Sequence, residues 1–307
     1  MSKAPEITEN LAQFAAALRG GGVVAFPTET VYGLGADATN SDAVLKIYET
    51  KGRPRFNPLI VHVADLAMAK SLVEFSPLAE KLAHFWPGPL TLVLPKRPDA
   101  HLSDIVTAGL DTVGIRIPDH PLALALIGAA GRPLAAPSAN PSGRLSPTTA
   151  AQVRAALPDV PVIDGGPSQS GVESTILAVD GETVTQLRAG ALPRNEIEAW
   201  LGRAIAVADA GAAIAAPGML ASHYAPQALL RLNAQAPTAD EVYLAFGSRP
   251  GRLNLSPAGD LHEAARNLFA MLHALDAEAQ KIAVAPIPHH GLGEAINDRL
   301  QRAAAPR

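Results

Sequence analysis

Short apolar segments alternate with helical patterns along most of this chain, and that alternation is what most constrains its fold. The apolar runs have the length of buried strands, and they fall at 23–26, 59–63, 90–94, 113–117, 134–136 and 160–163. Apolar residues at helical spacing mark the segments 41–51, 122–130 and 148–157. Strands that alternate with helices indicate an α/β domain.

Two later strand candidates, 174–179 and 184–187, are separated by Asp180-Gly181. An Asp-Gly pair between two such runs is typical of a β-hairpin, whose strands are antiparallel. A hairpin beside strands that are joined through helices predicts a twisted mixed sheet rather than a purely parallel one.

The length of the chain, 307 residues, predicts two domains, because a domain takes roughly 150 residues. The stretch from Arg203 to Pro226 is rich in alanine and glycine and only weakly periodic, which is typical of a linker. After it come a strand pattern at 242–246, a helix at 261–275, a strand at 282–285 and a helix at 293–304. We therefore expect a large α/β domain over 1–202, a linker over 203–232 and a smaller Rossmann-like α/β domain over 233–307.

Composition excludes several classes of protein. Hydrophobic residues make up 48% of the sequence, and there are no cysteines. The lack of cysteine excludes disulfides, thiolate zinc sites, iron–sulfur clusters and cysteine nucleophiles, and it fits a reducing, cytoplasmic location. The first residues lack the apolar core of a secretory signal, and the apolar run 122–131 is too short to cross a bilayer. Lys and Arg number 25 against 29 Asp and Glu, so anion binding has to come from locally gathered basic residues.

The segment Gly33-Leu-Gly-Ala-Asp-Ala38 matches the G-x-G-x-x-A pattern of dinucleotide-binding proteins. In a true fingerprint the first glycine follows a strand directly and the motif opens a helix. Here residues 28–32 separate the motif from the strand, and the next helical pattern begins only at Ser41. The context therefore disfavours a nicotinamide enzyme.

Three segments are unusually polar for so aliphatic a chain, namely 27–35, 51–57 and 137–143. Ligands bind at strand ends in open α/β sheets, and polar loops at such ends are candidates for a site. The second segment holds Lys51-Gly-Arg53, a compact pair of cations, and an arginine fork matches the oxygens of phosphate or carboxylate. Taken alone, the same pair fits better a solvated loop at the basic end of a helix.

Other polar residues allow both a structural and a functional interpretation. Ser138 and Asn140 stand among glycine and proline, where such residues usually form turns rather than contact a ligand. His62 lies inside an apolar strand, and this position taken by itself indicates a core histidine whose hydrogen bonds are satisfied. Arg116 lies between two isoleucines in a buried-looking strand and needs an anionic partner, either a structural carboxylate or a ligand. Arg188 ends a strand and supports a weaker version of the same argument.

Several separated motifs occur in one order along the chain and together are more specific than any of them alone. They are Thr28-Glu-Thr-Val-Tyr-Gly-Leu34, Lys51-x-Arg53, Asn57-Pro-Leu59, Ser138-x-Asn140, Glu173-Ser-Thr175, Leu187-Arg-Ala-Gly190, Pro217-Gly-Met219 and His223-Tyr-Ala-Pro226. In this order and spacing they resemble the threonylcarbamoyl-AMP synthase family, which has a YrdC-like domain, in its long form with an additional C-terminal domain.

The resemblance implies a twisted α/β sheet with helices around a cationic cavity. It also implies an enzyme that joins L-threonine, bicarbonate and ATP into threonylcarbamoyl-adenylate and releases pyrophosphate. Mg²⁺ would accompany ATP, held by phosphates and water, because no paired-carboxylate motif is visible. The product would pass to transferase proteins that modify a tRNA adenosine, so neither stable tRNA binding nor a membrane is required.

Carried over position by position, the resemblance implies contacts from named residues. L-threonine would contact Thr30, His62, Arg116 and Ser174. ATP would contact Lys51, Arg53, Asn57, Thr112, Ser138, Asn140, Ser146, Arg188 and Tyr224, with Lys51 and Arg53 as the catalytic cations. The chain departs from the family at Leu220-Ala-Ser222, which lacks the basic residues found there and puts a linker contact to phosphate in doubt.

Two other functions fit part of the pattern. An RNA-binding module would use the same cationic cavity, but the net charge of −4 and the lack of a basic stripe argue against it. A related carbamoyl-transfer enzyme of hydrogenase maturation contains this domain type, yet it has cysteine-rich zinc motifs that this chain lacks. Within the preferred interpretation, Tyr224 either closes over bound ATP or only anchors the linker.

Overall fold

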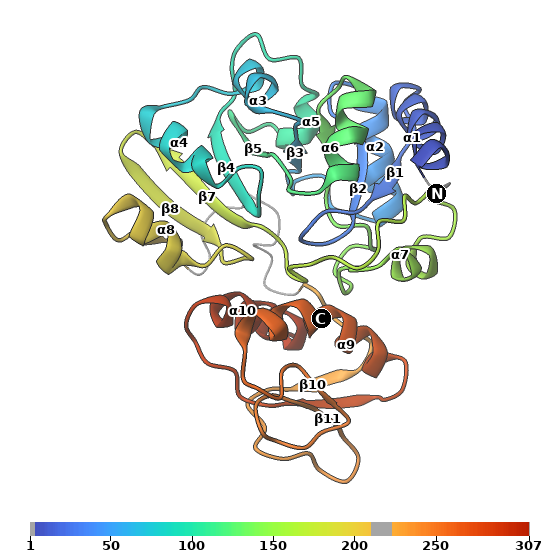
Figure 1. The fold of residues 1–307 in the computed structure, drawn as a ribbon, viewed down its shortest axis with the longest axis vertical. Coiled ribbons are helices and arrows are strands. Elements are labelled where there is room, and N and C mark those ends of the chain that lie inside the picture. Colours follow the sequence, from blue (N-terminus) through green and yellow to red (C-terminus); the bar gives the residue numbers. More distant parts are fainter. Residues whose placement is uncertain (1–3, 210–222, 307) are drawn as a thin grey trace.

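The computed structural model describes residues 4–209 and 223–306, which form two α/β units (Figure 1). The first domain is built on a nine-stranded sheet and the second domain on a four-stranded sheet. The motif at 217–219 and the departure at 220–222 lie outside the described residues. The predicted combination of a mixed sheet with helices and a smaller second α/β unit is confirmed.

The first sheet mixes parallel and antiparallel neighbours. In spatial order its strands are β1 (Val24–Phe26), β2 (Gly33–Asp37), β6 (Leu134–Ala135), β3 (Ile60–His62), β5 (Thr112–Arg116), β4 (Leu90–Pro95), β7 (Thr175–Asp180), β8 (Thr183–Arg188) and β9 (Ala206–Val207). β3 pairs with β5, β4 with β7 and β8 with β9 in parallel, and the other neighbours are antiparallel. The predicted hairpin joins β7 to β8, with Asp180 opposite Thr183.

Helices pack around this sheet on an aliphatic core. They are α1 (Ala4–Arg19), α2 (Ser41–Lys51), α3 (Leu66–Leu72), α4 (Pro77–Leu82), the 3₁₀ turn η1 (Ala83–Phe85), α5 (Asp104–Thr107), α6 (Pro121–Ala130), α7 (Ala150–Ala156) and α8 (Arg194–Leu201). α1 and α6 lie side by side near β1 and β2 (Figure 1), where Leu18, Phe26 and Leu126 are fully buried. This layer closes one end of the sheet and leaves the ends of the central strands for the site.

Two segments differ from the sequence-based expectation. The apparent dinucleotide motif is strand β2, fully buried, so the polar loop after β1 ends at Tyr32 and not at Gly35. A Cβ on Gly35 would lie 2.7 Å from the Phe26 ring, so this glycine serves close packing between β1 and β2. The expected strand 160–163 forms only a single bridge, in which Ala25 pairs with Val162 at the edge of the sheet.

The second domain has an all-parallel sheet, as expected for a Rossmann-like unit. Its strands in spatial order are β10 (Leu229–Arg231), β13 (Lys281–Val284), β11 (Val242–Ala245) and β12 (Leu253–Asn254), and its helices are α9 (Leu261–Asp276) and α10 (Leu292–Ala304). β9 and β10 both lie inside the stretch 203–232 expected as a linker, and they belong to the first and second sheets respectively. Among the described residues, no helix is long and apolar enough to cross a membrane.

The two helices of the second domain lie on the side that faces the first domain (Figure 1). Several contacts cross between the domains, and three of them involve charged or ring side chains of α9 and α10. Glu294 of α10 pairs with Arg194 of α8 at 2.7 Å, the His273 ring of α9 lies 3.2 Å from the carbonyl of Ser146, and Arg299 of α10 pairs with Glu173 at 2.7 Å. The last two contacts reach segments that border the cavity described next.

Candidate active site

A cavity lies at one end of the central strands of the first sheet, and residues of the first domain line it together with His223 and Tyr224. β3 and β5 both end there, β8 ends there, and β7 begins there because it runs antiparallel to β5 across β4. The lining residues are Thr28, Thr30, Val31, Gly33, Arg53, Ile60, His62, Arg116, Ala136, Pro137, Ser138, Glu173, Ser174, Arg188, His223 and Tyr224. The topology thus gathers polar groups from the three predicted polar loops at one place.

Most of the predicted site residues meet in this cavity. Those that line it are Thr30, Arg53, His62, Arg116, Ser138, Ser174, Arg188 and Tyr224. Thr28, Glu173 and His223 also line it, although the sequence interpretation gave them no role. Each of the three is the first residue of a motif shared with the family that the sequence resembles. Their position next to predicted site residues could have indicated a role in the site.

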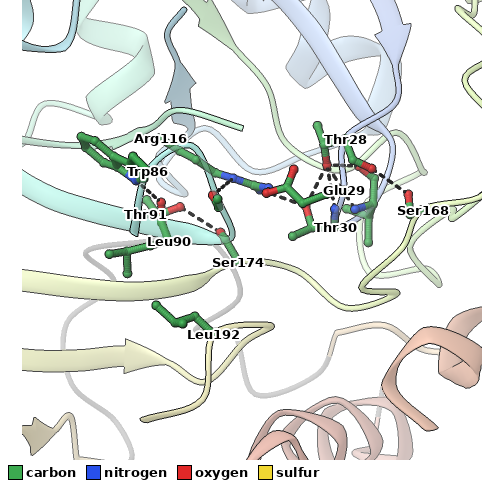
Figure 2. Close-up of polar contacts among 12 residues, drawn as sticks. Thr28, Glu29, Thr30, Trp86, Leu90, Thr91, Arg116, Ser168, Ser174 and Leu192 are labelled. Carbon is green, nitrogen blue, oxygen red and sulfur yellow. Dashed lines mark hydrogen bonds and ion pairs between the residues drawn. The ribbon is translucent and has the colours of Figure 1, made fainter. Parts of the chain in front are cut away.

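Arg116 is the hub of the polar network that Figure 2 shows. It is 3% exposed, and its Nε donates to the carbonyl of Gly88 at 3.2 Å. Its Nη1 donates to Thr30 Oγ1 at 2.9 Å and its Nη2 to Glu29 Oε1 at 2.5 Å. The anionic partner that a buried arginine requires is therefore Glu29. Thr28 and Thr30 hold each other through hydroxyls 2.8 Å apart, which fixes the loop after β1.

Two buried polar atoms beside this network have no hydrogen-bond partner among the described residues, namely Glu29 Oε2 and His62 Nδ1. Buried polar groups are normally satisfied, so such atoms at a cavity point to a ligand. Burial, together with the nearby charge of Arg116, lowers the pKa of His62 to about 3. His62 is thus a neutral imidazole at pH 7, and it is not the satisfied core histidine that its strand alone suggested.

Ser174 and Arg188 form the opposite wall. Ser174 Oγ lies 2.8 Å from the Thr91 hydroxyl. Arg188 Nη2 donates to the carbonyl of Ser174 at 2.8 Å and to its hydroxyl at 3.1 Å. Burial lowers the pKa of Arg188 below its ordinary value, because taking a guanidinium out of water disfavours its charged form. The wall therefore presents a hydroxyl and a desolvated cation together.

The Lys51-Gly52-Arg53 segment ends α2 and is not a solvated loop. Asn40 caps the start of α2 by accepting from two main-chain amides, and Gly52 ends it with a φ of 59°. Lys51 is 4% exposed and Arg53 is 7% exposed. Burial holds the pKa of Lys51 well below its usual range, with Arg53 adding repulsion, and it lowers the pKa of Arg53 to about 10.

The hydrogen bonds of these two cations go to main-chain carbonyls. Lys51 Nζ donates to the carbonyl of Ser138 at 2.6 Å and also to that of Asn140, so it holds the Ser-Ala-Asn loop in place. Arg53 Nη2 donates to the carbonyl of Pro58 at 3.0 Å. Because carbonyl dipoles do not neutralise a buried charge, this corner of the cavity favours an anion.

Five predicted residues do not line the cavity, namely Lys51, Asn57, Thr112, Asn140 and Ser146. Asn140 Nδ2 donates to the carbonyls of Pro141 and Arg144, and Ser146 Oγ donates to Glu173 at 2.5 Å. The side-chain amide of Asn57 is buried without a partner among the described residues. Thr112 opens β5, whereas Arg116 closes it, and the two ends of a five-residue strand lie roughly 13 Å apart.

No cluster of three or more His, Cys, Asp or Glu residues able to hold a metal ion occurs within the described ranges. The carboxylates at the cavity are already engaged, Glu29 by Arg116 and Glu173 by Arg299. What the site offers is a set of buried cations, hydroxyls and a neutral imidazole. Such a set suits the binding of several anionic groups at once.

Comparison with known proteins agrees with this geometry. A family profile described as "Telomere recombination" matches residues 16–190, and one described as "Threonylcarbamoyl-AMP synthase, C-terminal domain" matches residues 192–305. The threonylcarbamoyl-AMP synthase of Bacillus subtilis is 44% identical over 97% of this chain and 93% of its own length.

A second relative is known in three dimensions. The threonylcarbamoyl-AMP synthase of Pyrococcus abyssi is 40% identical over 94% of this chain and 92% of its own length. The crystal structure of P. abyssi Sua5 complexed with L-threonine aligns with a TM-score of 0.88 and 39% identity, and covers 96% of this chain and 94% of that chain. Both domains and their order are thus shared, and the chain belongs to the threonylcarbamoyl-AMP synthase family of adenylate-forming enzymes.

Proposed function

We propose that this enzyme condenses L-threonine, bicarbonate and ATP into threonylcarbamoyl-adenylate and pyrophosphate. The observation that carries the proposal is the convergence of Arg53, Arg116 and Arg188 on one cavity of a chain whose net charge is −4. Substrates that all carry anionic groups need converging cations to lie together. The names of the relatives support the formation of a threonylcarbamoyl-adenylate, and the L-threonine complex of the P. abyssi protein supports L-threonine as a substrate.

The L-threonine subsite is assigned to Thr30, His62, Arg116 and Ser174. Arg116 attracts the carboxylate of the amino acid, while the hydroxyls of Thr30 and Ser174 supply neutral hydrogen bonds. The neutral imidazole of His62 adds no positive charge beside the α-amine. Bicarbonate takes up a proton and loses water to give carbon dioxide. The amine nitrogen attacks its carbon and releases a proton to solvent, which gives a threonine carbamate.

The ATP subsite is assigned to Arg53, Ser138, Arg188 and Tyr224, with Lys51, Asn57, Asn140 and Ser146 behind them. Thr112, which the resemblance also implied as an ATP contact, lies at the far end of β5 and is not part of this subsite. The carbamate oxygen attacks the α-phosphorus, the bond to the bridging oxygen of the β-phosphate breaks, and pyrophosphate leaves. The cations stabilise the charge on the phosphate oxygens, so catalysis rests on positioning and electrostatics. Lys51 acts mainly by holding the Ser138–Asn140 loop.

Mg²⁺ enters this proposal as part of the ATP substrate. The carboxylates at the cavity pair with arginines through one oxygen each, so the proposal places no protein carboxylate on the ion. Phosphate oxygens and water would hold the ion, as is common for Mg²⁺ with nucleotides.

The proposal includes a shift of Tyr224 and His223 when the nucleotide binds. The cavity leaves about 50 Å³ of free volume, room for a few water molecules only. Tyr224 lines it with a left-handed φ of 61°, which is rare for a residue other than glycine. A strained residue at a site is commonly one whose conformation changes with the ligand.

The product, a reactive mixed anhydride, would be consumed by a separate transferase that modifies a tRNA adenosine. The alternative function, an RNA-binding module that uses the same cavity, predicts salt-sensitive RNA binding without nucleotide turnover. Pyrophosphate release from ATP, measured with L-threonine and bicarbonate omitted in turn, separates the two. Release that requires both supports the synthase, and equal release without threonine overturns it.

A further inference from the structure

Arg299, in helix α10 of the second domain, reaches the edge of the cavity in the first domain. Its side chain is 0% exposed. Its Nε donates to Glu173 Oε2 at 2.7 Å, and its Nη1 donates to the carbonyl of Ala189 at 2.9 Å. Nη1 also lies 2.6 Å from Asp298, its neighbour on α10. A fully buried arginine thus links the two domains through a carboxylate that lines the cavity.

Glu173 is an anion at a site that binds anions. It lines the cavity together with Arg53 and Arg188, and its Oε1 accepts from the Ser146 hydroxyl at 2.5 Å. Burial alone would raise the pKa of Glu173, but the charges of Arg299 and Arg188 and the Ser146 hydrogen bond outweigh it and hold that pKa below its ordinary value. Glu173 is therefore ionised at pH 7. Unless its charge were compensated, it would repel the phosphates of ATP.

Arg299 also supports Tyr224, which lines the same cavity. The guanidinium of Arg299 lies 5.2 Å from the centre of the Tyr224 ring, at cation–π distance. The Tyr224 ring also packs against the ring of Phe269 in α9, with the two centroids 5.6 Å apart. One side chain of the second domain thus contacts two of the groups that border the proposed ATP subsite.

We propose that Arg299 is a positioning residue of the active site, through which the second domain completes the ATP subsite. It neutralises Glu173, so that a carboxylate can fix Ser146 without repelling ATP, and it seats Tyr224 against the cavity. This inference rests on the proposed function, because it assumes that the phosphates of ATP lie in the cavity. In this proposal the second domain contributes to ATP binding through Arg299.

The same interface supplies a matched control. Arg194 of α8 pairs with Glu294 of α10 at 2.7 Å, with side chains 34% and 25% exposed. Neither residue lines the cavity. Arg194→Gln therefore removes another Arg–Glu ion pair that attaches the same helix, a partly exposed one. It leaves the charge at the cavity unchanged.

The test compares steady-state pyrophosphate release by Arg299→Gln, Glu173→Gln/Arg299→Gln and Arg194→Gln. In Arg299→Gln the uncompensated carboxylate should raise the KM for ATP about tenfold or more and the KM for threonine far less, because ATP is polyanionic and threonine is a zwitterion. The double variant removes both charges, and its ATP KM should return to within about threefold of wild type. Arg194→Gln should change neither KM.

The inference is overturned if Arg299→Gln behaves as Arg194→Gln does, or if removing the Glu173 charge fails to restore the ATP KM. Should Arg299→Gln not fold, Arg299→Lys provides the second test, because it keeps a cation beside Glu173 and should keep the ATP KM within a few-fold. If Arg299→Lys folds but raises the KM for ATP and the KM for threonine by the same factor, the inference is also overturned. Failure of the proposed function looks different, since the wild-type protein would then release no pyrophosphate in response to threonine.

Discussion

The Glu29–Arg116 ion pair allows stability and substrate binding to be separated by mutation. Arg116 donates through three nitrogen atoms, to the carbonyl of Gly88, to Thr30 and to Glu29. Arg116→Met removes all three bonds and leaves the carboxylate of Glu29 buried alone. Loss of one partner of a buried ion pair costs about 3–5 kcal/mol, so we expect the free energy of unfolding to fall by about that much.

The double variant Glu29→Gln/Arg116→Met removes the second charge as well. Replacing a buried ion pair by neutral groups of similar volume is commonly tolerated, so stability should return to within about 2 kcal/mol of wild type. Activity should not return, because the guanidinium that attracts the threonine carboxylate is still missing. Each lost charged hydrogen bond is worth about 1.5–3 kcal/mol, which corresponds to a rise in the threonine KM of about tenfold or more.

The assays are urea unfolding followed by tryptophan fluorescence and pyrophosphate release titrated with threonine. Trp86 is a suitable reporter, because its indole donates to the carbonyl of Leu90 at 2.7 Å on the strand beside β5 (Figure 2). If Arg116→Met keeps the wild-type KM for threonine, Arg116 does not hold the substrate. If the double variant is no more stable than the single one, the buried charge is not what destabilises it.

Three further predictions follow from buried groups at the cavity. Arg53→Lys should lower the free energy of unfolding by about 2 kcal/mol, since its bonds to Asn57 and Pro58 are lost, and should raise the ATP KM. Wild-type values of both would show that the Arg53 guanidinium neither stabilises this segment nor binds ATP. Tyr224→Ala should lower the unfolding free energy by about 3 kcal/mol and raise the ATP KM, whereas Tyr224→Phe should retain stability; an unchanged ATP KM in both would leave only the anchoring role. His62 and His223 have folded pKa values of about 3, below the unfolded value, so the stability they provide is present above about pH 6.5 and is lost as the pH falls toward 3. Urea unfolding at pH 7.5 and about pH 5 measures this loss, which should be smaller in His62→Gln; a flat pH profile would contradict burial of neutral imidazoles.

Local signals in the sequence were sufficient for most of the fold. α2 spans Ser41–Lys51, as its apolar spacing predicts, and Gly52 ends it in a left-handed conformation. The Asp180-Gly181 turn gave the hairpin correctly because its geometry depends on adjacent residues only. The expectation was wrong at β2, where residues 33–35 form a buried strand instead of the end of a polar loop, and Gly35 packs closely against Phe26 of the neighbouring strand.

The site was less predictable because its partners are far apart in the chain. From the sequence, a buried Arg116 was expected to have an anionic partner. Whether this partner is a ligand or Glu29 could not be predicted, because Glu29 lies 87 positions away. Arg299 was missed altogether, since its partner Glu173 lies 126 positions away. A signal existed nonetheless, because Arg299 stands at helical spacing between Ile296 and Ala303 on the buried face of α10.

The most direct test of the proposed reaction is the identity of the nucleotide product. The enzyme is incubated with ATP, L-threonine and ¹³C-labelled bicarbonate, and the adenylate is analysed by mass spectrometry with unlabelled bicarbonate as the control. The proposal predicts AMP joined to a threonine carbamate, heavier by the mass of the label when ¹³C is supplied. An adenylate of threonine itself, or a product whose mass is the same with labelled and unlabelled bicarbonate, would contradict it.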